Sequence, residues 1–202
     1  MLKRLYVDNY RCLVNFTLEC RELTLLVGPN GSGKSSVLDV LLALRQLLSG
    51  VAKVTDPGVF PTRALTRWQS RDLQVFEVTV GLEGETDLTY RIEVEHEKDT
   101  RRARITLESL KAGQNALFES RRGEVQLYRD NHSKGPTYSA DWSESALARV
   151  AARNDNRPGR ADSGRPHGQP LADAAFRGRS KGQGKRCEGR LDALGRRRGG
   201  GG

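Results

Sequence analysis

The chain has 202 residues with 34 Lys or Arg, 25 Asp or Glu and three Cys. This length suits one domain or somewhat more, and three cysteines (Cys12, Cys20 and Cys187) exclude a disulfide-stapled secreted mini-protein. No run of about 18 apolar residues is present, and residues 1–11 lack the apolar core of a signal peptide. We therefore expect a cytoplasmic protein with no membrane-spanning segment.

The net charge of +9 is concentrated in one part of the sequence. Residues 1–156 carry 22 basic and 21 acidic side chains, whereas residues 157–202 carry 12 and four, together with 12 of the 22 glycines. Such a composition buries too little apolar surface to offset the entropy lost on ordering. The sequence therefore predicts an ordered region over residues 1–156 and a disordered, Arg/Gly-rich tail over residues 157–202.

The N-terminal elements follow from the spacing of apolar residues. Two-residue spacing with turn residues between predicts an antiparallel strand pair over residues 2–18. Residues 23–27, Leu-Thr-Leu-Leu-Val, are apolar on both faces, which is typical of a central strand. Helical spacing then predicts one buried helix over residues 35–49.

The rest of the ordered region is predicted to be mainly β-structure. Residues 50–70 contain Asp-Pro-Gly and a further proline, which indicates a loop. Alternating apolar residues punctuated by glycines predict a meander of strands over residues 73–130, followed by a short helix over residues 143–152. No second βαβ unit follows, so we expect the strand over residues 23–27 to keep an unpaired edge.

Residues 28–35 match the pattern G-x-x-x-x-G-K-[ST], the phosphate-binding Walker A loop. Its glycines let backbone N–H groups approach phosphate oxygens, and the N-terminus of the following helix adds a positive dipole end. In this pattern Lys34 contacts the β- and γ-phosphates, and the Ser35 hydroxyl is a ligand of Mg²⁺. The sequence contains no N-K-x-D motif that would read a guanine base. It therefore predicts the binding of ATP with Mg²⁺.

These residues also carry a family resemblance. The hairpin Leu-Lys-Arg-Leu-Tyr-Val-Asp-Asn-Tyr-Arg-Cys-Leu, followed by a strand and Gly-Pro-Asn-Gly-Ser-Gly-Lys-Ser-Ser, resembles the start of the RecF/SMC/OLD-like AAA ATPases, which are P-loop proteins of the ABC-ATPase type. The resemblance covers residues 1–156 and implies an α/β fold: the N-terminal portion of a P-loop NTPase, with an antiparallel β-lobe after the first helix.

The resemblance also implies which residues bind the nucleotide. It places Arg11, on a looser match, near the nucleotide, and it leaves Gln69 and Gln74 as alternatives for the Q-loop glutamine. It further implies ATP hydrolysis by the intact family, a homodimer formed through the P-loop heads, and work on DNA or in defence against phage. The loop residues that it implies are Gly28, Pro29, Asn30, Gly31, Ser32, Gly33, Lys34, Ser35 and Ser36.

Hydrolysis in this family needs a Walker B strand, in which several apolar residues end in Asp-Glu. No apolar strand of this sequence ends in that way, so we identify no catalytic residue and expect little turnover by this chain alone. We interpret the tail from about residue 157 as an out-of-frame or degenerate end of a truncated ATPase. A solvated linker and a basic arm that binds nucleic acid non-specifically are the alternatives.

The remaining polar residues point to structural roles. Glu93, Glu95 and Glu97 alternate with Val and His, which indicates the solvated face of a strand. Cys12 and Cys20 are expected to be packed or half-buried thiols. The three histidines have no partners at metal-ligand spacing, so we expect no metal other than nucleotide-bound Mg²⁺.

Overall fold

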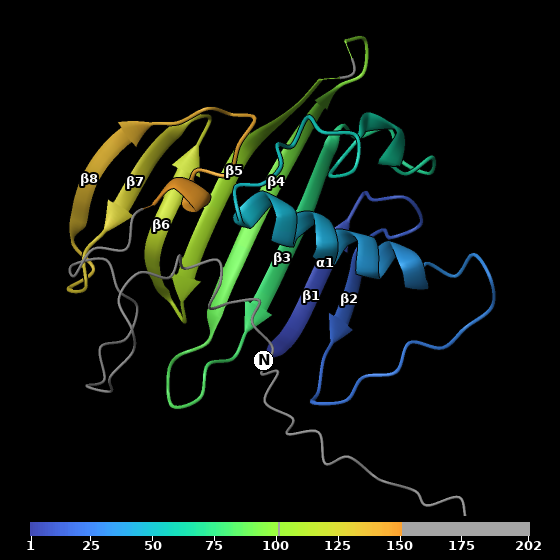
Figure 1. Cartoon of the computed structure of the whole chain (residues 1–202), viewed down its shortest axis with the longest axis horizontal. Coiled ribbons are helices and arrows are strands. Elements are labelled where there is room, and N and C mark those ends of the chain that lie inside the picture. The colour runs from blue at the N-terminus through green and yellow to red at the C-terminus, as the bar shows by residue number, and fades with distance from the viewer. Residues whose placement is uncertain (101, 151–202) are drawn as a thin grey trace, which may run out of the picture.

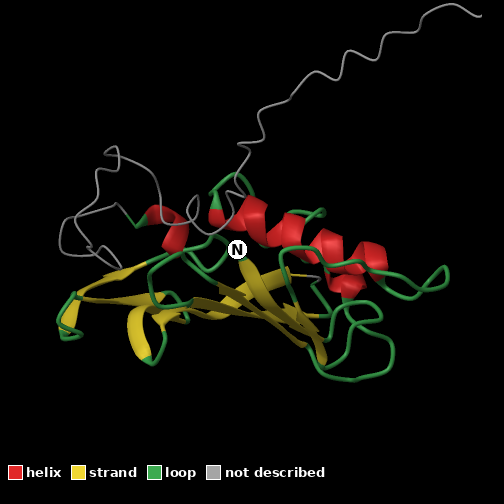
Figure 2. Cartoon of the chain, turned by 90° about the horizontal axis from the view of Figure 1, so that it is seen from below, coloured by secondary structure: helices red, strands yellow, loops and turns green. Residues whose placement is uncertain are grey.

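The computed structural model describes residues 1–100 and 102–150. An eight-stranded sheet forms one layer, and helix α1 (Lys34–Leu48) lies across one of its faces (Figure 1, Figure 2). The strands are β1 (Leu2–Asp8), β2 (Phe16–Glu19), β3 (Leu73–Val80), β4 (Leu88–Glu97), β5 (Arg102–Ala112), β6 (Asn115–Arg121), β7 (Glu124–Tyr128) and β8 (Lys134–Ser139). Their order in the sheet is β2-β1-β3-β4-β5-β6-β7-β8, and every neighbouring pair is antiparallel.

Most of the predicted elements are confirmed. The N-terminal hairpin forms β1 and β2, the helix begins one residue earlier than expected, and the meander forms β3 to β7. Strand β8 was not predicted, because its sequence Lys-Gly-Pro-Thr-Tyr-Ser contains two residues that disfavour strands. As an edge strand it tolerates the proline, which has no N–H to donate. Of the predicted helix over residues 143–152, the described part up to residue 150 holds only the 3₁₀ helix η2 (Leu147–Arg149), and residues 151 and 152 lie outside the described chain.

The prediction of a central strand over residues 23–27 is wrong for the described chain. This segment has no regular secondary structure, and Leu23, Leu25 and Val27 are 89%, 80% and 78% exposed. The apolar pattern is typical of a buried strand, but a strand exists only when a neighbouring strand accepts its hydrogen bonds. No described strand lies beside it.

The expected α/β fold and the buried helix also need correction. The described sheet is wholly antiparallel, so it shows the predicted antiparallel β-lobe but no parallel strands, and β3 joins this lobe to β1 of the N-terminal hairpin. Helix α1 buries only one face. Val40, Leu44 and Leu47 point into the core, whereas Leu38 and Leu42 are exposed.

The core lies between α1 and the sheet. Alternate residues of β1, β3 and β4 face the helix, as their buried-and-exposed alternation shows. At one end the ring of Phe60 stacks on Phe76 at 4.2 Å, and the ring of Tyr10 meets both edge-on. This aromatic cluster joins the turn after β1, the loop after α1, and β3, so it holds two connecting segments against the sheet.

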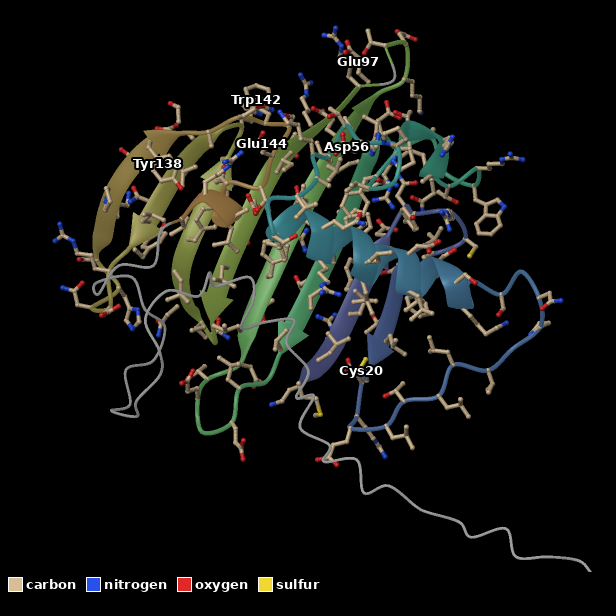
Figure 3. All side chains as sticks on the ribbon, in the orientation of Figure 1. Cys20, Asp56, Glu97, Tyr138, Trp142 and Glu144 are labelled. Atoms are coloured by element: carbon tan, nitrogen blue, oxygen red, sulfur yellow. The ribbon has the colours of Figure 1, made fainter. Side chains whose placement is uncertain are left out.

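A buried carboxylate secures the last described segment. Glu108 is fully buried and accepts hydrogen bonds from the hydroxyls of Tyr90 and Ser145 and from the backbone N–H of Ala146. Burial raises the pKa of Glu108, and these donors oppose that shift. Glu144, labelled in Figure 3, pairs with Lys53 in the loop that follows α1. The segment is thereby tied both to the sheet and to the end of the helix.

The sheet face opposite α1 carries paired charges. Arg91 pairs with Glu93 at 2.7 Å, and Arg104 pairs with Glu95 at 2.8 Å. The prediction of a solvated glutamate face is therefore confirmed. No helix within residues 1–100 and 102–150 has the length and apolar character needed to cross a membrane.

A second buried polar group links the loop after α1 to the sheet. The amide of Gln74 donates to the carbonyl oxygens of Asn9 and Ala64, so its oxygen faces Nε2 of His96 at 2.9 Å. That oxygen can only accept, so His96 donates from Nε2, and Nδ1 accepts from the Thr62 hydroxyl. Burial lowers the pKa of His96 to about 4, which keeps the ring neutral in the folded chain.

This network predicts a pH dependence of stability. The unfolded chain binds a proton at His96 near pH 6.5 and the folded chain only near pH 4. Acidification between these values should therefore lower the free energy of unfolding by at most about 1.4 kcal/mol per pH unit. Urea unfolding of the native chain and of His96→Asn between pH 6.5 and pH 4 measures the part of this free-energy change that is due to His96.

The exposed histidine His132 provides the control. His132→Asn should keep the native pH dependence, whereas His96→Asn should lose the component assigned to His96. If the free energy of unfolding changes equally with pH in the native chain and in His96→Asn, the buried His96 ring does not contribute the predicted pH dependence.

Candidate functional site

Residues 28–33 form a bend between the exposed segment and α1. Gly28, Gly31 and Gly33 all have positive φ values, of 154°, 83° and 95°. A side chain would be strained in each of these conformations. The glycines of the motif are therefore required by the backbone path that the loop takes.

The side chain of Lys34 folds over this loop. Its Nζ donates to the carbonyl oxygens of Gly28 and Pro29 at 2.8 and 2.7 Å, and to the Ser32 hydroxyl at 3.3 Å. No carboxylate of the described residues contacts residues 28–36. The positive charge of Lys34 is therefore held above the loop by neutral groups and is available to an anion.

The first turn of α1 presents unused backbone donors. Gly33 is the N-cap residue and offers no side chain, and the first helical bond runs from Val37 N–H to the Gly33 carbonyl. Among the described residues, none accepts a hydrogen bond from the N–H groups of Lys34, Ser35 or Ser36. These donors, the helix dipole and the exposed Ser35 hydroxyl together form an arrangement that suits phosphate oxygens and their Mg²⁺.

Cys12 ties the N-terminal hairpin to the loop. A Cβ placed on Gly33 would lie only 2.8 Å from the Cys12 sulfur and 3.2 Å from a methyl group of Leu13. The Cys12 thiol also lies 4.0 Å from the Ser36 hydroxyl. Both Cys12 and Cys20 are half-buried free thiols, as predicted. The turn after β1 therefore packs directly against the start of α1.

A cavity of about 640 Å³ opens beside this contact. Its walls come from three segments: the turn after β1, the first half of α1 and the loop before β3. The size falls within the range of small-molecule sites. The residues that line it include Trp68, Arg11, Arg63, Arg67 and Asp39, together with the buried Tyr10.

Arg11 lies at the wall shared by the cavity and the helix. Its guanidinium pairs with Asp39 of α1 and lies 5.1 Å from the centre of the Tyr10 ring, and its backbone N–H donates to the Ala64 carbonyl. The structure thus places Arg11 in a fixed position beside α1.

The predicted loop residues are consecutive, and Arg11 reaches α1 through its pair with Asp39. The structure separates the two glutamines, because the Gln74 side chain is used in the buried network, whereas Gln69 is half-buried and accepts from Arg71. Sequence reasoning missed the cavity residues Asp39, Arg63, Arg67 and Trp68. The one available signal was a tryptophan within a loop rich in Gly and Pro, since exposed aromatic residues often mark binding sites.

The family model of the AAA ATPase domain matches residues 1–130. The chain belongs to the AAA ATPase family. It is also similar to the OLD nuclease of Thermus scotoductus, with 55% identity over 38 residues, which is 19% of this chain and 7% of that protein. The resemblance inferred from the sequence is therefore confirmed as the N-terminal part of an AAA/OLD-like ATPase, and the chain spans a small fraction of that relative's length.

The packing of Cys12 on Gly33 gives a test of the loop. Gly33→Ala and Gly31→Ala both place a Cβ at positive φ, which costs about 1–2 kcal/mol each. Only the Cβ at Gly33 meets neighbouring atoms, whereas none lies within 4 Å at Gly31. Urea unfolding should therefore show Gly33→Ala to be less stable than Gly31→Ala by about 1–3 kcal/mol. Equal stability of the two variants would contradict the close approach of the hairpin to the loop.

Proposed function

We propose that this chain binds ATP with Mg²⁺ at residues 28–36. The observation that carries the proposal is the combination of Lys34 above the loop and unused N–H donors at the start of α1. Membership of the AAA ATPase family supports the same function. Ser35 is exposed at the first turn, where its hydroxyl would hold Mg²⁺ bound to the phosphates.

The cavity beside Cys12 is the proposed place of the nucleoside. It adjoins the loop through the Cys12 contact with Gly33, and the exposed Trp68 offers aromatic surface to a base. Arg11 at its wall would attract the negatively charged nucleotide. Its pairing with Asp39 neutralises part of that charge, so we assign to Arg11 a smaller share of the binding energy than to Lys34.

Hydrolysis is the expected activity of the intact family, and we propose only slow turnover by this chain. No carboxylate of the described residues contacts the loop, and Asp39, the acidic residue closest to it in sequence, pairs with Arg11. A water molecule at the γ-phosphate would therefore find no general base in residues 1–100 and 102–150. Homodimerisation through P-loop heads and a link to DNA or phage defence also remain proposals. The predicted tail over residues 157–202 lies outside the described residues.

The central test is calorimetry with MgATP on the native chain and on Lys34→Ala. Loss of one charge-assisted contact should weaken binding by about 10- to 100-fold. Lys111→Ala removes an exposed lysine of β5 and should leave the affinity unchanged. Equal affinities of the native chain and Lys34→Ala would refute nucleotide binding at the loop.

Magnesium dependence gives a further prediction. Ser35→Ala removes the hydroxyl that is the proposed Mg²⁺ ligand. It leaves the charged phosphate contact of Lys34 in place. Its affinity for ATP should fall in the presence of Mg²⁺ and should match that of the native chain in EDTA. An equal loss of ATP affinity with Mg²⁺ and in EDTA would show that Ser35 maintains the conformation of the loop and does not bind the metal.

A further inference from the structure

The cavity beside the phosphate loop contains one negative charge among several positive ones. Of the described residues that line it, Asp39 is the only acidic one. Three arginines line it as well: Arg11, Arg63 and Arg67. Asp39 is also the only acidic residue of α1. A carboxylate repels a polyanionic ligand, so the partner of Asp39 decides how this charge affects a nucleotide in the cavity.

Asp39 pairs with one of these arginines. Nη1 of Arg11 donates to Oδ2 of Asp39, and no described residue forms another ion pair with either side chain. The two side chains are 46% and 45% exposed. An ion pair of this kind contributes little free energy, because water solvates both charges well. The pair can therefore open at small cost when a stronger anion is present.

The backbone of Arg11 is held in place, whereas its side chain can turn. Its N–H donates to the Ala64 carbonyl at 2.6 Å, and Tyr10 and Leu13 exchange two backbone hydrogen bonds that close the turn around it. Within the described chain the guanidinium uses a single N–H donor, on Asp39, and rests against the Tyr10 ring. Its other N–H donors remain available to phosphate oxygens.

The phosphate loop lies within reach of this guanidinium. Cys12, which follows Arg11, contacts Gly33 at the end of the loop. Asp39 follows Ser35 by four positions, so their side chains are neighbours on one face of α1, with Cβ atoms about 5–6 Å apart. A change of rotamer moves an arginine head group over such a distance. Arg11 can therefore leave Asp39 and meet phosphates bound beside Ser35 without moving its backbone.

We propose that Asp39 is a positioning residue that acts on the nucleotide through Arg11. Without nucleotide, Asp39 holds the guanidinium on α1. When MgATP binds, the phosphates take Arg11 from Asp39, which is then solvated by water. A triphosphate carries more negative charge than one carboxylate and accepts paired hydrogen bonds from a guanidinium. Because the contact with Asp39 has to break, it lowers the affinity for MgATP. This inference rests on the proposed binding of MgATP at residues 28–36.

Calorimetry with MgATP at an ionic strength of about 0.15 M tests this role, since the Debye length is then about 8 Å and distant charges are screened. Asp39→Asn should bind MgATP about two- to five-fold more tightly than the native chain, because Arg11 loses the competing carboxylate. Asp39→Glu restores the carboxylate and should return the affinity towards the native value. Asp56→Asn removes a charge next to the lining residues Pro57 and Gly58 and should leave the affinity unchanged.

A double-mutant cycle separates an effect through Arg11 from a general effect of charge. Arg11→Gln should weaken binding, and in that background Asp39→Asn should no longer tighten it. Equal or weaker binding by Asp39→Asn than by the native chain, or the same tightening with and without Arg11, would overturn the proposal.

The Lys34→Ala comparison separates the failure of this proposal from the failure of the proposed function. If Lys34→Ala weakens binding but Arg11 and Asp39 show no coupling, only the role of Asp39 is wrong. If the native chain and Lys34→Ala bind MgATP equally, the nucleotide site is refuted and the role of Asp39 with it.

Discussion

The packing of one face of α1 on the apolar face of the sheet is the interaction on which the rest of the structure depends. It buries Val40, Leu44 and Leu47 against β1, β3 and β4 and thereby fixes the helix axis. Because the axis is fixed, the N-terminus of the helix lies beside the turn after β1, where Cys12 contacts Gly33. The phosphate loop has few contacts of its own and takes its position from these two neighbours.

The same packing explains why the cavity forms where it does. The aromatic cluster of Tyr10, Phe60 and Phe76 holds the turn after β1 and the loop after α1 against the sheet. The Gln74 and His96 network adds hydrogen bonds to the same loop from inside. Two connections that would otherwise have many conformations are thus fixed as walls, and the space between them opens beside the loop.

The sequence predicted those parts of the fold that depend on local periodicity. The hairpin, α1 and β3 to β7 each have a long apolar repeat and clear turn residues. The prediction of a strand over residues 23–27 was wrong because an apolar pattern indicates only a tendency to be buried. A buried strand also needs a neighbouring strand to pair with. β8 was missed because an edge strand needs little apolar sequence.

The candidate site likewise contains residues that the sequence predicts and residues that only the folded structure brings together. Residues 28–36 were recognised because phosphate binding by backbone N–H groups demands a short motif of fixed spacing. The cavity could not be predicted, since Tyr10, Asp39 and Trp68 are far apart in the sequence and meet only through the tertiary packing. The Arg11 pair with Asp39 likewise depends on where α1 crosses the hairpin.

The central claim is that backbone amides at the start of α1, together with Lys34, hold a triphosphate. Hydrogen–deuterium exchange of residues 28–36 with and without MgATP measures those amides directly. Amide exchange in this segment should be slower when MgATP is present, with no comparable change in β6 to β8. Unchanged exchange across residues 28–36 at saturating MgATP would contradict it.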